Sequence, residues 1–278
     1  MNTSQCIKEY CITWKLAFTF LLSSALILCS NSSTASPPPH WHANDYIINS
    51  FVTIALKNEF SPQTRNIRKW TQAIAYQISD STLDSKLHQQ ITQRHLSHLA
   101  AITGVNISPI KPNQRPNLTI LFSHEDDLER DIQQHFSLTD PQKITQLSQS
   151  SVCLAHLTFK PNGSIKNATV IIPVDRARAN AKLLSCVVEE LSQIMGLPND
   201  SNAVYPSVFN DKSYDDYLSG LDCLLLQLLY HPKIRVGMDK SATVKQLNLI
   251  VHDHNFQQLI HHATDLVSQE SSLYHLLN

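Results

Sequence analysis

The sequence predicts an α+β fold with a mixed sheet, and three observations support this prediction. Apolar and polar residues alternate in four short segments, a pattern typical of strands. Apolar residues recur at helical spacing in the longer segments between and after those strands. The expected order of elements is α-β-α-β-β-β-α-α, and strands that do not alternate with helices argue against a doubly wound sheet.

The first 35 residues are expected to be a signal peptide. Two lysines precede the uncharged run 16–29, which is short for a membrane span and typical of a signal-peptide core. Small residues at the −3 and −1 positions suit cleavage after Ala35. Two alternatives remain open: a lipoprotein anchored at Cys29 and a retained membrane anchor. We therefore expect an exported protein, periplasmic or secreted, that meets a membrane only through its leader or a lipid.

Composition limits the classes of function. The chain has 22 Lys and Arg against 23 Asp and Glu, with no basic block that would predict nucleic-acid binding. Three cysteines follow the leader, namely Cys153, Cys186 and Cys223. In an oxidising compartment the simplest arrangement of an odd number is one disulfide and one buried thiol. An apolar helix surrounds Cys223, so we expect it to be a core residue rather than a reactive one.

The elements of the first half follow from local patterns. After a proline-rich linker, 36–44, a helix is expected to begin at Asn44 or Asp45. Alternation predicts strands over 70–78 and 117–123. Between them the spacing predicts a helix over 83–102, with Leu87, Ile91, Leu99 and Ile102 facing inward and Gly104 ending it.

The second half contains a hairpin and three helical segments. Strands over 151–159 and 165–174 flank a Pro-Asn-Gly turn. A helix is expected over 181–195, a strongly apolar one over 218–230, and a His-rich helical segment from about residue 244. We expect one domain over 45–240 and a helical C-terminal extension over 241–278.

The helix over 181–195 has an apolar face at helical spacing, and its other face is polar. Glu189 and Gln193 are four residues apart and project from the same strip. Gly196 ends the helix. Taken alone, a Glu-Glu pair on a helix is compatible with a solvated face, and this alternative stays open.

The segment EELSQIMGLPND resembles the zinc-binding motif of metzincin proteases, H-E-x-x-H-x-x-G-x-x-H. In that frame Glu189, Gln193 and Asn199 stand at the three ligand positions. Glu190 stands at the position of the general base, and Gly196 at the turn glycine. The order of the preceding strands and helix also matches that of a zincin, so the resemblance implies a zincin-like fold.

Downstream motifs resemble one family more closely. SVFND falls where matrixin-like enzymes place a methionine turn, with Phe209 in place of methionine, and LSGLDCLLLQLLYHP resembles their closing helix. Together with a following Gly-Met pair, these motifs are similar to domain-of-unknown-function family 2927, a family of exported bacterial proteins. That resemblance implies a disulfide between Cys153 and Cys186.

The substitutions change the chemistry that the motif can support. Zinc favours imidazole and thiolate, so a carboxylate and two amides predict a chain without zinc and without another cofactor. Without a metal, Glu190 lacks an activated water. A second carboxylate from Asp200 or Asp211 is an alternative partner for it.

Two functions remain after this argument. The first is a pseudoprotease that binds a peptide or an envelope component in the inherited cleft through Glu189, Gln193, Asn199, Asp200 and Phe209. Protease clefts bind extended peptides at a sheet edge, and we expect the strand 168–174 to be that edge. The second is a hydrolase in which Glu190 is catalytic, with an atypical metal or none.

Other candidate sites are less specific. The pairs His95 and His98, His252 and His254, and His261 and His262 lack a recognised ligand spacing, and the 14 histidines are expected mainly at the surface. Ser192 lacks the G-x-S-x-G context of a nucleophile.

Overall fold

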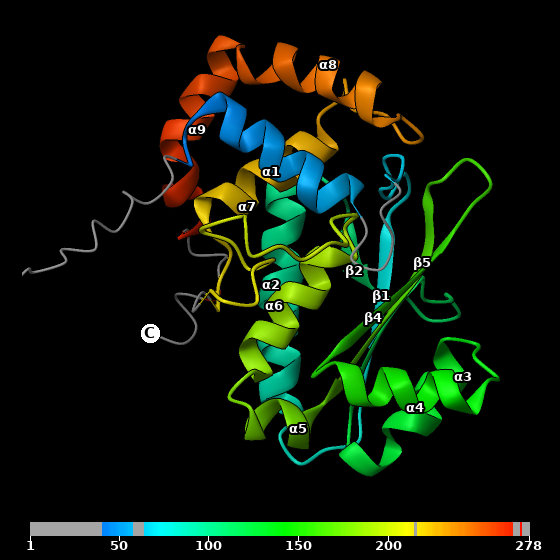
Figure 1. Cartoon of the computed structure of the whole chain (residues 1–278). Coiled ribbons are helices and arrows are strands. Elements are labelled where there is room, and N and C mark those ends of the chain that lie inside the picture. Colours follow the sequence, from blue (N-terminus) through cyan, green and yellow to red (C-terminus); the bar gives the residue numbers. More distant parts are fainter. Residues whose placement is uncertain (1–40, 58–63, 214–215, 269–272, 274–278) are drawn as a thin grey trace, which may run out of the picture. The chain divides into compact units, whose positions relative to one another are not determined.

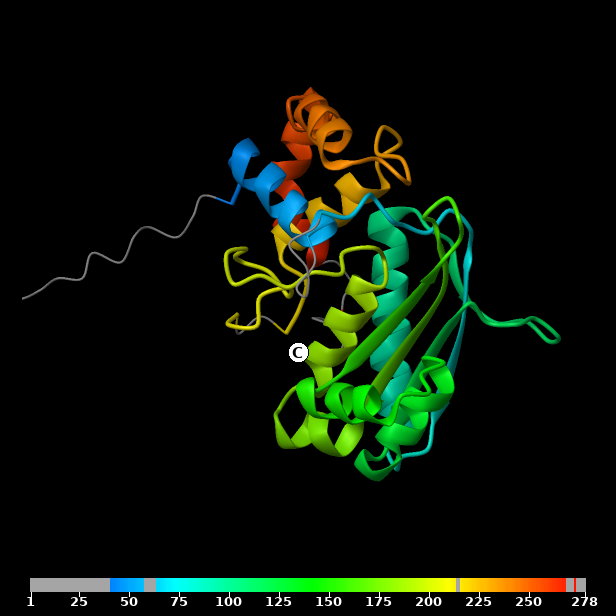
Figure 2. The same ribbon diagram turned by 45° about the vertical axis from the view of Figure 1, so that its right-hand side comes forward.

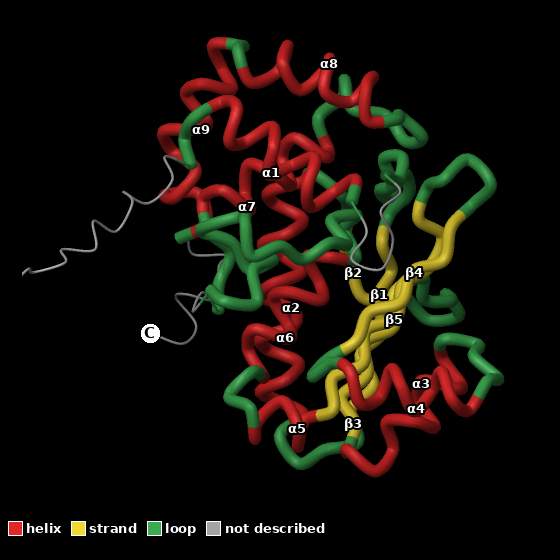
Figure 3. The backbone as a smooth tube through the Cα atoms, viewed as in Figure 1, coloured by secondary structure: helices red, strands yellow, loops and turns green. Residues whose placement is uncertain are grey.

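Five strands form one mixed sheet in the computed structural model of the chain, which describes residues 41–57, 64–213, 216–268 and 273. The strand order is β2-β1-β3-β5-β4, and all neighbours are parallel except β4, which is antiparallel to β5 (Figures 1 and 3). This arrangement confirms the predicted α+β fold with a mixed sheet. The strands are β1 (Ile74–Asp80), β2 (Ile107–Pro109), β3 (Leu118–Ser123), β4 (Leu154–Phe159) and β5 (Ile165–Pro173).

One prediction about the sheet was wrong. The segment 168–174 is not an edge strand, because β5 lies between β3 and β4 and pairs with both. Residues 170–173 of β5 are buried on both faces, as is typical of an interior strand. The edge of the hairpin is therefore β4, and Val174 already belongs to the following helix. The other edge, β2, was not predicted.

Helices cover the two faces of the sheet, and the side chains of β3 show both layers. Ile120 and Phe122 belong to the main core, whereas Leu121 between them packs into a smaller core on the opposite face. The main core lies under α2 (Ser85–Thr103) and α6 (Leu183–Gln193). The smaller core lies under α3 (Leu128–His135) and α4 (Pro141–Ser150), two helices that the sequence analysis missed.

The buried face of α2 differs from the predicted one. Ile91, Leu99 and Ile102 are buried as expected, but Leu87 is exposed. Leu83, where the helix was expected to begin, precedes α2 and is 99 % exposed. Leu96 is also buried, and the other buried positions of this helix are polar: His88, Thr92, His95 and His98. The expectation that the histidines lie mainly at the surface therefore fails on this helix.

Four further helices pack together beyond one end of α2 (Figure 1). The apolar helix predicted over 218–230 is α7, buried along almost its whole length between α1, α2 and α9. The His-rich segment forms two helices rather than one, because Asp253 caps a new helix. The helices are α1 (Asn44–Leu56), α7 (Gly220–Tyr230), α8 (Lys240–Val251) and α9 (His254–Val267).

Two features position the two ends of α6. The predicted disulfide between Cys153 and Cys186 is present and joins the start of β4 to the first turns of α6, with a Cα–Cα distance of 5.9 Å. At the other end, Gly196 has a φ of +117°, and a Cβ there would lie 2.1 Å from the carbonyl oxygen of Arg68. Only glycine fits that conformation and that contact.

Hydrogen bonds fix the same helix end. The indole N–H of Trp70 donates to the carbonyl of Ile194 over 2.8 Å, and the hydroxyl of Tyr230 donates to that of Met195 over 2.8 Å. Both groups satisfy carbonyls that a helix end leaves without partners. The turn after α6 is therefore held from two directions.

The N-terminal predictions lie outside the described residues. These are the signal peptide 1–35, the alternative anchor at Cys29, and the linker 36–44 up to residue 40. Within the described part of the chain, no helix combines the length and the apolar character that a bilayer crossing needs.

The short helix α5 (Val174–Ala179) links β5 to α6.

Candidate functional site

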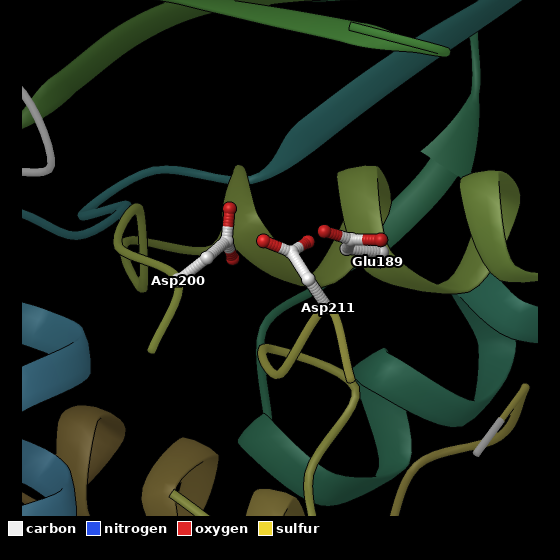
Figure 4. A group of neighbouring side chains, drawn as sticks. All are labelled: Glu189, Asp200 and Asp211. Carbon is white, nitrogen blue, oxygen red and sulfur yellow. The ribbon is translucent and has the colours of Figure 1, made fainter. Parts of the chain in front are cut away.

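Three carboxylates meet beside the last turns of α6, and we call them the acidic site: Glu189, Asp200 and Asp211. One carboxylate oxygen of each lies within 4.8 Å of the others, and Figure 4 shows the three side chains pointing toward one another. Glu189 comes from α6, whereas the other two come from the loop that follows it. The sequence analysis placed Asp211 only as an alternative partner for Glu190, because its loop conformation could not be derived from local patterns.

The predicted site residues take three different positions. Gln193 joins the acidic site, since its side-chain amide donates to Oδ1 of Asp200 over 2.8 Å. Asn199 points the other way and is buried. Its amide donates to the carbonyl of Thr53 over 3.0 Å, and its backbone N–H donates to that of Ile54 over 3.2 Å. Asn199 therefore ties the loop to the end of α1.

Phe209 is a fully buried side chain in the loop that also carries Asp200 and Asp211. Its carbonyl accepts the N–H of Ser201 over 2.8 Å, and its own N–H donates to the hydroxyl of Ser207 over 3.1 Å. The first of these bonds joins the two ends of the segment 201–209. The segment supports Asp211 two residues later, so Phe209 contributes to the site through the position of the loop.

Asp222 fastens this loop to α7. Its carboxylate accepts the Ser207 hydroxyl over 2.6 Å and the Val208 N–H over 3.1 Å, and it also forms a capping box with Ser219. Burial raises the pKa of Asp222 to about 6, although these donors oppose the shift. A buried carboxylate with four donors is a structural link between the loop and the core.

Glu190 is more deeply buried than its neighbour Glu189. It is only 8 % exposed. Burial, and then the charges of Glu189 and Asp200, raise the pKa of Glu190 well above its usual range. Among the described residues, no hydrogen-bond donor contacts its carboxylate. Such a group favours the protonated form and is of the kind that serves acid and base chemistry.

The donor atoms of the acidic site match one class of cation. Carboxylate oxygens suit hard cations such as calcium and magnesium, and the site contains neither imidazole nor thiolate. The residues therefore do not fit zinc. They also suit the amino or guanidinium group of a ligand, because three carboxylates so close together gain from a positive charge.

Sequence reasoning missed a buried polar cluster between α6 and α2. Nε2 of His95 lies 3.1 Å from both the Val188 carbonyl and the Ser192 hydroxyl. Burial, and then the charge of His98, lower the pKa of His95 to about 3. The Ser192 hydroxyl donates to the Val188 carbonyl over 2.6 Å, so this serine has a structural role. A helical period that places a histidine among apolar residues was the available signal.

The edge strand β4 lies beside α6 and is open on its outer side. Among the described residues, its backbone forms hydrogen bonds with β5 and with no other segment. Cys153 and Cys186 connect the start of this strand to α6. An open edge next to a polar helix face is the arrangement in which an extended chain can add a strand.

Comparison with known protein families shows to which family the chain belongs. Residues 44–248 match the model of a family described as "Protein of unknown function (DUF2927)". The chain belongs to the DUF2927 family. The match includes the whole acidic site, the disulfide and the loop between α6 and α7, and it ends within α8. No curated protein and no solved structure matches the chain.

Proposed function

We propose that this DUF2927 protein is an exported binding protein that holds an extended peptide, or a cell-envelope component of similar shape, without zinc. The main support is the meeting of Glu189, Asp200 and Asp211 beside α6, the helix that also contacts the edge strand β4. The frame of the motif supports a zincin-like origin, since Glu189 stands at its first ligand position and Gly196 at its turn. The leader supports export.

The chemistry of the acidic site specifies the ligand further. Its three carboxylates attract a positive group, and Gln193 orients one of them. The ligand is therefore a chain with a lysine, an arginine or an amine at this point. Backbone hydrogen bonds to β4 would supply affinity without regard to sequence, while the acidic site would select the charge.

Fluorescence anisotropy with labelled hexapeptides tests this proposal. Two C-terminally amidated pools without acidic residues are compared in a buffer with a chelator, one pool rich in lysine and the other in alanine. The lysine pool should bind at least about tenfold more tightly, because each close charge pair contributes on the order of that factor. Glu189→Gln should remove most of the difference.

A matched control is Asp265→Asn, which removes a carboxylate that is 82 % exposed on α9. This variant should bind both pools as the unchanged chain does. Equal binding of the two pools would contradict the proposal. So would a Glu189→Gln variant that keeps the full preference for lysine.

A second function is favoured by one observation: next to Glu189 of the acidic site, the buried carboxylate of Glu190 meets no hydrogen-bond donor within the described part of the chain. In a hydrolase, Glu189, Asp200 and Asp211 would hold a hard cation, and that cation would supply a Lewis acid. Glu190 would accept the proton of the attacking water at its carboxylate and pass it to the leaving group. Its raised pKa suits this role, since a base with a pKa nearer neutrality also returns its proton readily.

The two functions are separated by turnover. The lysine pool, with a quencher at its far end, is incubated with the chain in calcium or magnesium. The hydrolase predicts cleavage that Glu190→Gln abolishes while binding persists. If the chain is a binding protein, we expect no cleavage, and the unchanged chain and Glu190→Gln should bind the pool equally.

A further inference from the structure

The segment Arg65–Trp70 crosses the C-terminal end of α6 and is fixed along its length. Its Ile67 N–H donates to the carbonyl of Met238 over 2.8 Å, and the Ile165 N–H donates to the carbonyl of Lys69 over 3.1 Å. The Arg68 carbonyl rests against Gly196, as described above. The backbone that positions the two arginines of this segment is therefore rigid.

The side chain of Arg68 reaches from this point to the end of β4. Its guanidinium lies 3.9 Å from the ring centroid of Phe159, the last residue of that strand. A guanidinium that is stacked on an aromatic ring loses little conformational freedom on binding, and its edge remains available for hydrogen bonds. Arg68 thus bridges the end of the helix and the end of the open sheet edge.

Arg65 lies close to Arg68, and both are partly exposed. Burial, and then the charge of Arg68, lower the pKa of Arg65. Within the described ranges, neither guanidinium forms an ion pair with a carboxylate. The neighbouring Lys69 is different, because its ammonium donates to the carbonyls of Leu229 and Ile234 and so completes the end of α7.

We propose that Arg65 and Arg68 form an anion subsite at the end of β4 that binds a carboxylate of the extended ligand. This inference rests on the proposed function, and it adds a second charge to the ligand. The subsite and the acidic site are built from different residues around the end of α6, where the Arg68 carbonyl packs against Gly196 and Gln193 donates to Asp200. Positive and negative subsites at separate points fix the direction of a bound chain.

Two sources of the carboxylate fit this geometry: the C-terminus of a peptide and an Asp or Glu side chain. Three labelled hexapeptide pools distinguish them, all containing lysine. The first has a free C-terminus and no acidic residue, the second is amidated and has no acidic residue, and the third is amidated and has one glutamate at varied positions. Binding to the full chain is measured by fluorescence anisotropy.

The carboxylate should strengthen binding at least about tenfold over the second pool, because charge-assisted hydrogen bonds to arginine are strong. The first pool gains if the C-terminus binds, and the third gains if a side chain binds. Arg65→Gln and Arg68→Gln should each remove most of this gain, and Arg68→Lys should restore only part of it. Arg115→Gln, at an exposed position in the loop between β2 and β3, should keep all of it.

The outcomes separate this inference from the proposed function. If the second pool binds and Glu189→Gln weakens it, but neither carboxylate pool binds more tightly, the anion subsite alone is refuted. If none of the pools binds, both proposals are refuted. Melting curves check that the variants fold, and Arg65→Gln provides a second test should Arg68→Gln be unstable.

Discussion

Two adjacent glutamates show how surroundings decide chemistry at the scale of single residues. Glu189 and Glu190 are neighbours on α6, yet Glu189 joins the acidic site whereas Glu190 is buried. Their helix positions diverge by about 100°. The sequence showed this divergence, but burial of the second carboxylate follows from packing that no local pattern specifies.

Replacement of Glu190 should change how stability depends on pH. Because its folded-state pKa is raised, its contribution to stability is complete below its usual value of 4.5 and is lost as the pH rises through the folded-state value. Glu190→Gln removes that loss. The variant should be more stable than the unchanged chain at pH 8, by about 1–3 kcal/mol, and the difference should vanish near pH 4.

Urea unfolding across this pH range measures the effect. His95 has the opposite dependence, since its lowered pKa contributes stability above pH 6.5 that is lost toward pH 3. Both proteins retain His95, so the difference between them isolates Glu190. A difference that does not change with pH would show that Glu190 is not the buried carboxylate described here.

Gly196 is a second residue whose replacement has a definite outcome. Gly196→Ala should lower the free energy of unfolding by about 3 kcal/mol or more, because a Cβ would collide with the Arg68 carbonyl. Gly104→Ala is a matched control. That glycine also has a positive φ, +71°, but a Cβ there meets nothing within 4 Å, and the cost should be about 1 kcal/mol. Equal losses in the two variants would contradict this account of the turn.

At the scale of elements, the site depends on how β4, α6 and the loop after α6 are joined. The disulfide connects the strand to the helix, and Asn199 and Asp222 connect the loop to α1 and α7. The elements were largely predictable, since their periodicity is local. The links between them were not, except for the disulfide, which the family resemblance implied.

Removal of the disulfide tests the first of these links. The double replacement Cys153→Ala and Cys186→Ala opens a loop with a sequence separation of 33, and the chain-entropy model gives a loss of about 3–4 kcal/mol. Cys223→Ala should cost less, because it removes one small buried side chain. Urea unfolding measures both.

Thiol labelling provides the complementary check on the part of the chain beyond residue 40. Burial raises the pKa of Cys223 to about 12, so it should react only after unfolding, and then as one thiol. Three reactive thiols in that region would contradict the disulfide.

For the whole molecule, the order of elements was predicted better than their arrangement. The expected strands and the two central helices are present, because apolar periodicity specifies them. The helices α3 and α4 were missed since few of their residues are apolar, although Asp140 before Pro141 is a cap signal. The edge of the sheet was assigned to β5 rather than β4, because strand order depends on long-range pairing.

Seen together, the elements separate the molecule into layers with different roles. The sheet carries helices on both faces, while α1, α7, α8 and α9 pack together beyond one end of α2 (Figure 2). The acidic site and the proposed anion subsite both lie around the single turn that ends α6. We propose that they act as one binding surface without zinc.

Elemental analysis of the chain, purified from cells without a chelator, tests that claim most directly. We expect far less than one zinc or other transition-metal ion per chain, and the same result for Glu189→Ala. One such ion per chain that is lost in Glu189→Ala would contradict it, and would show that the metal site of the motif is still in use.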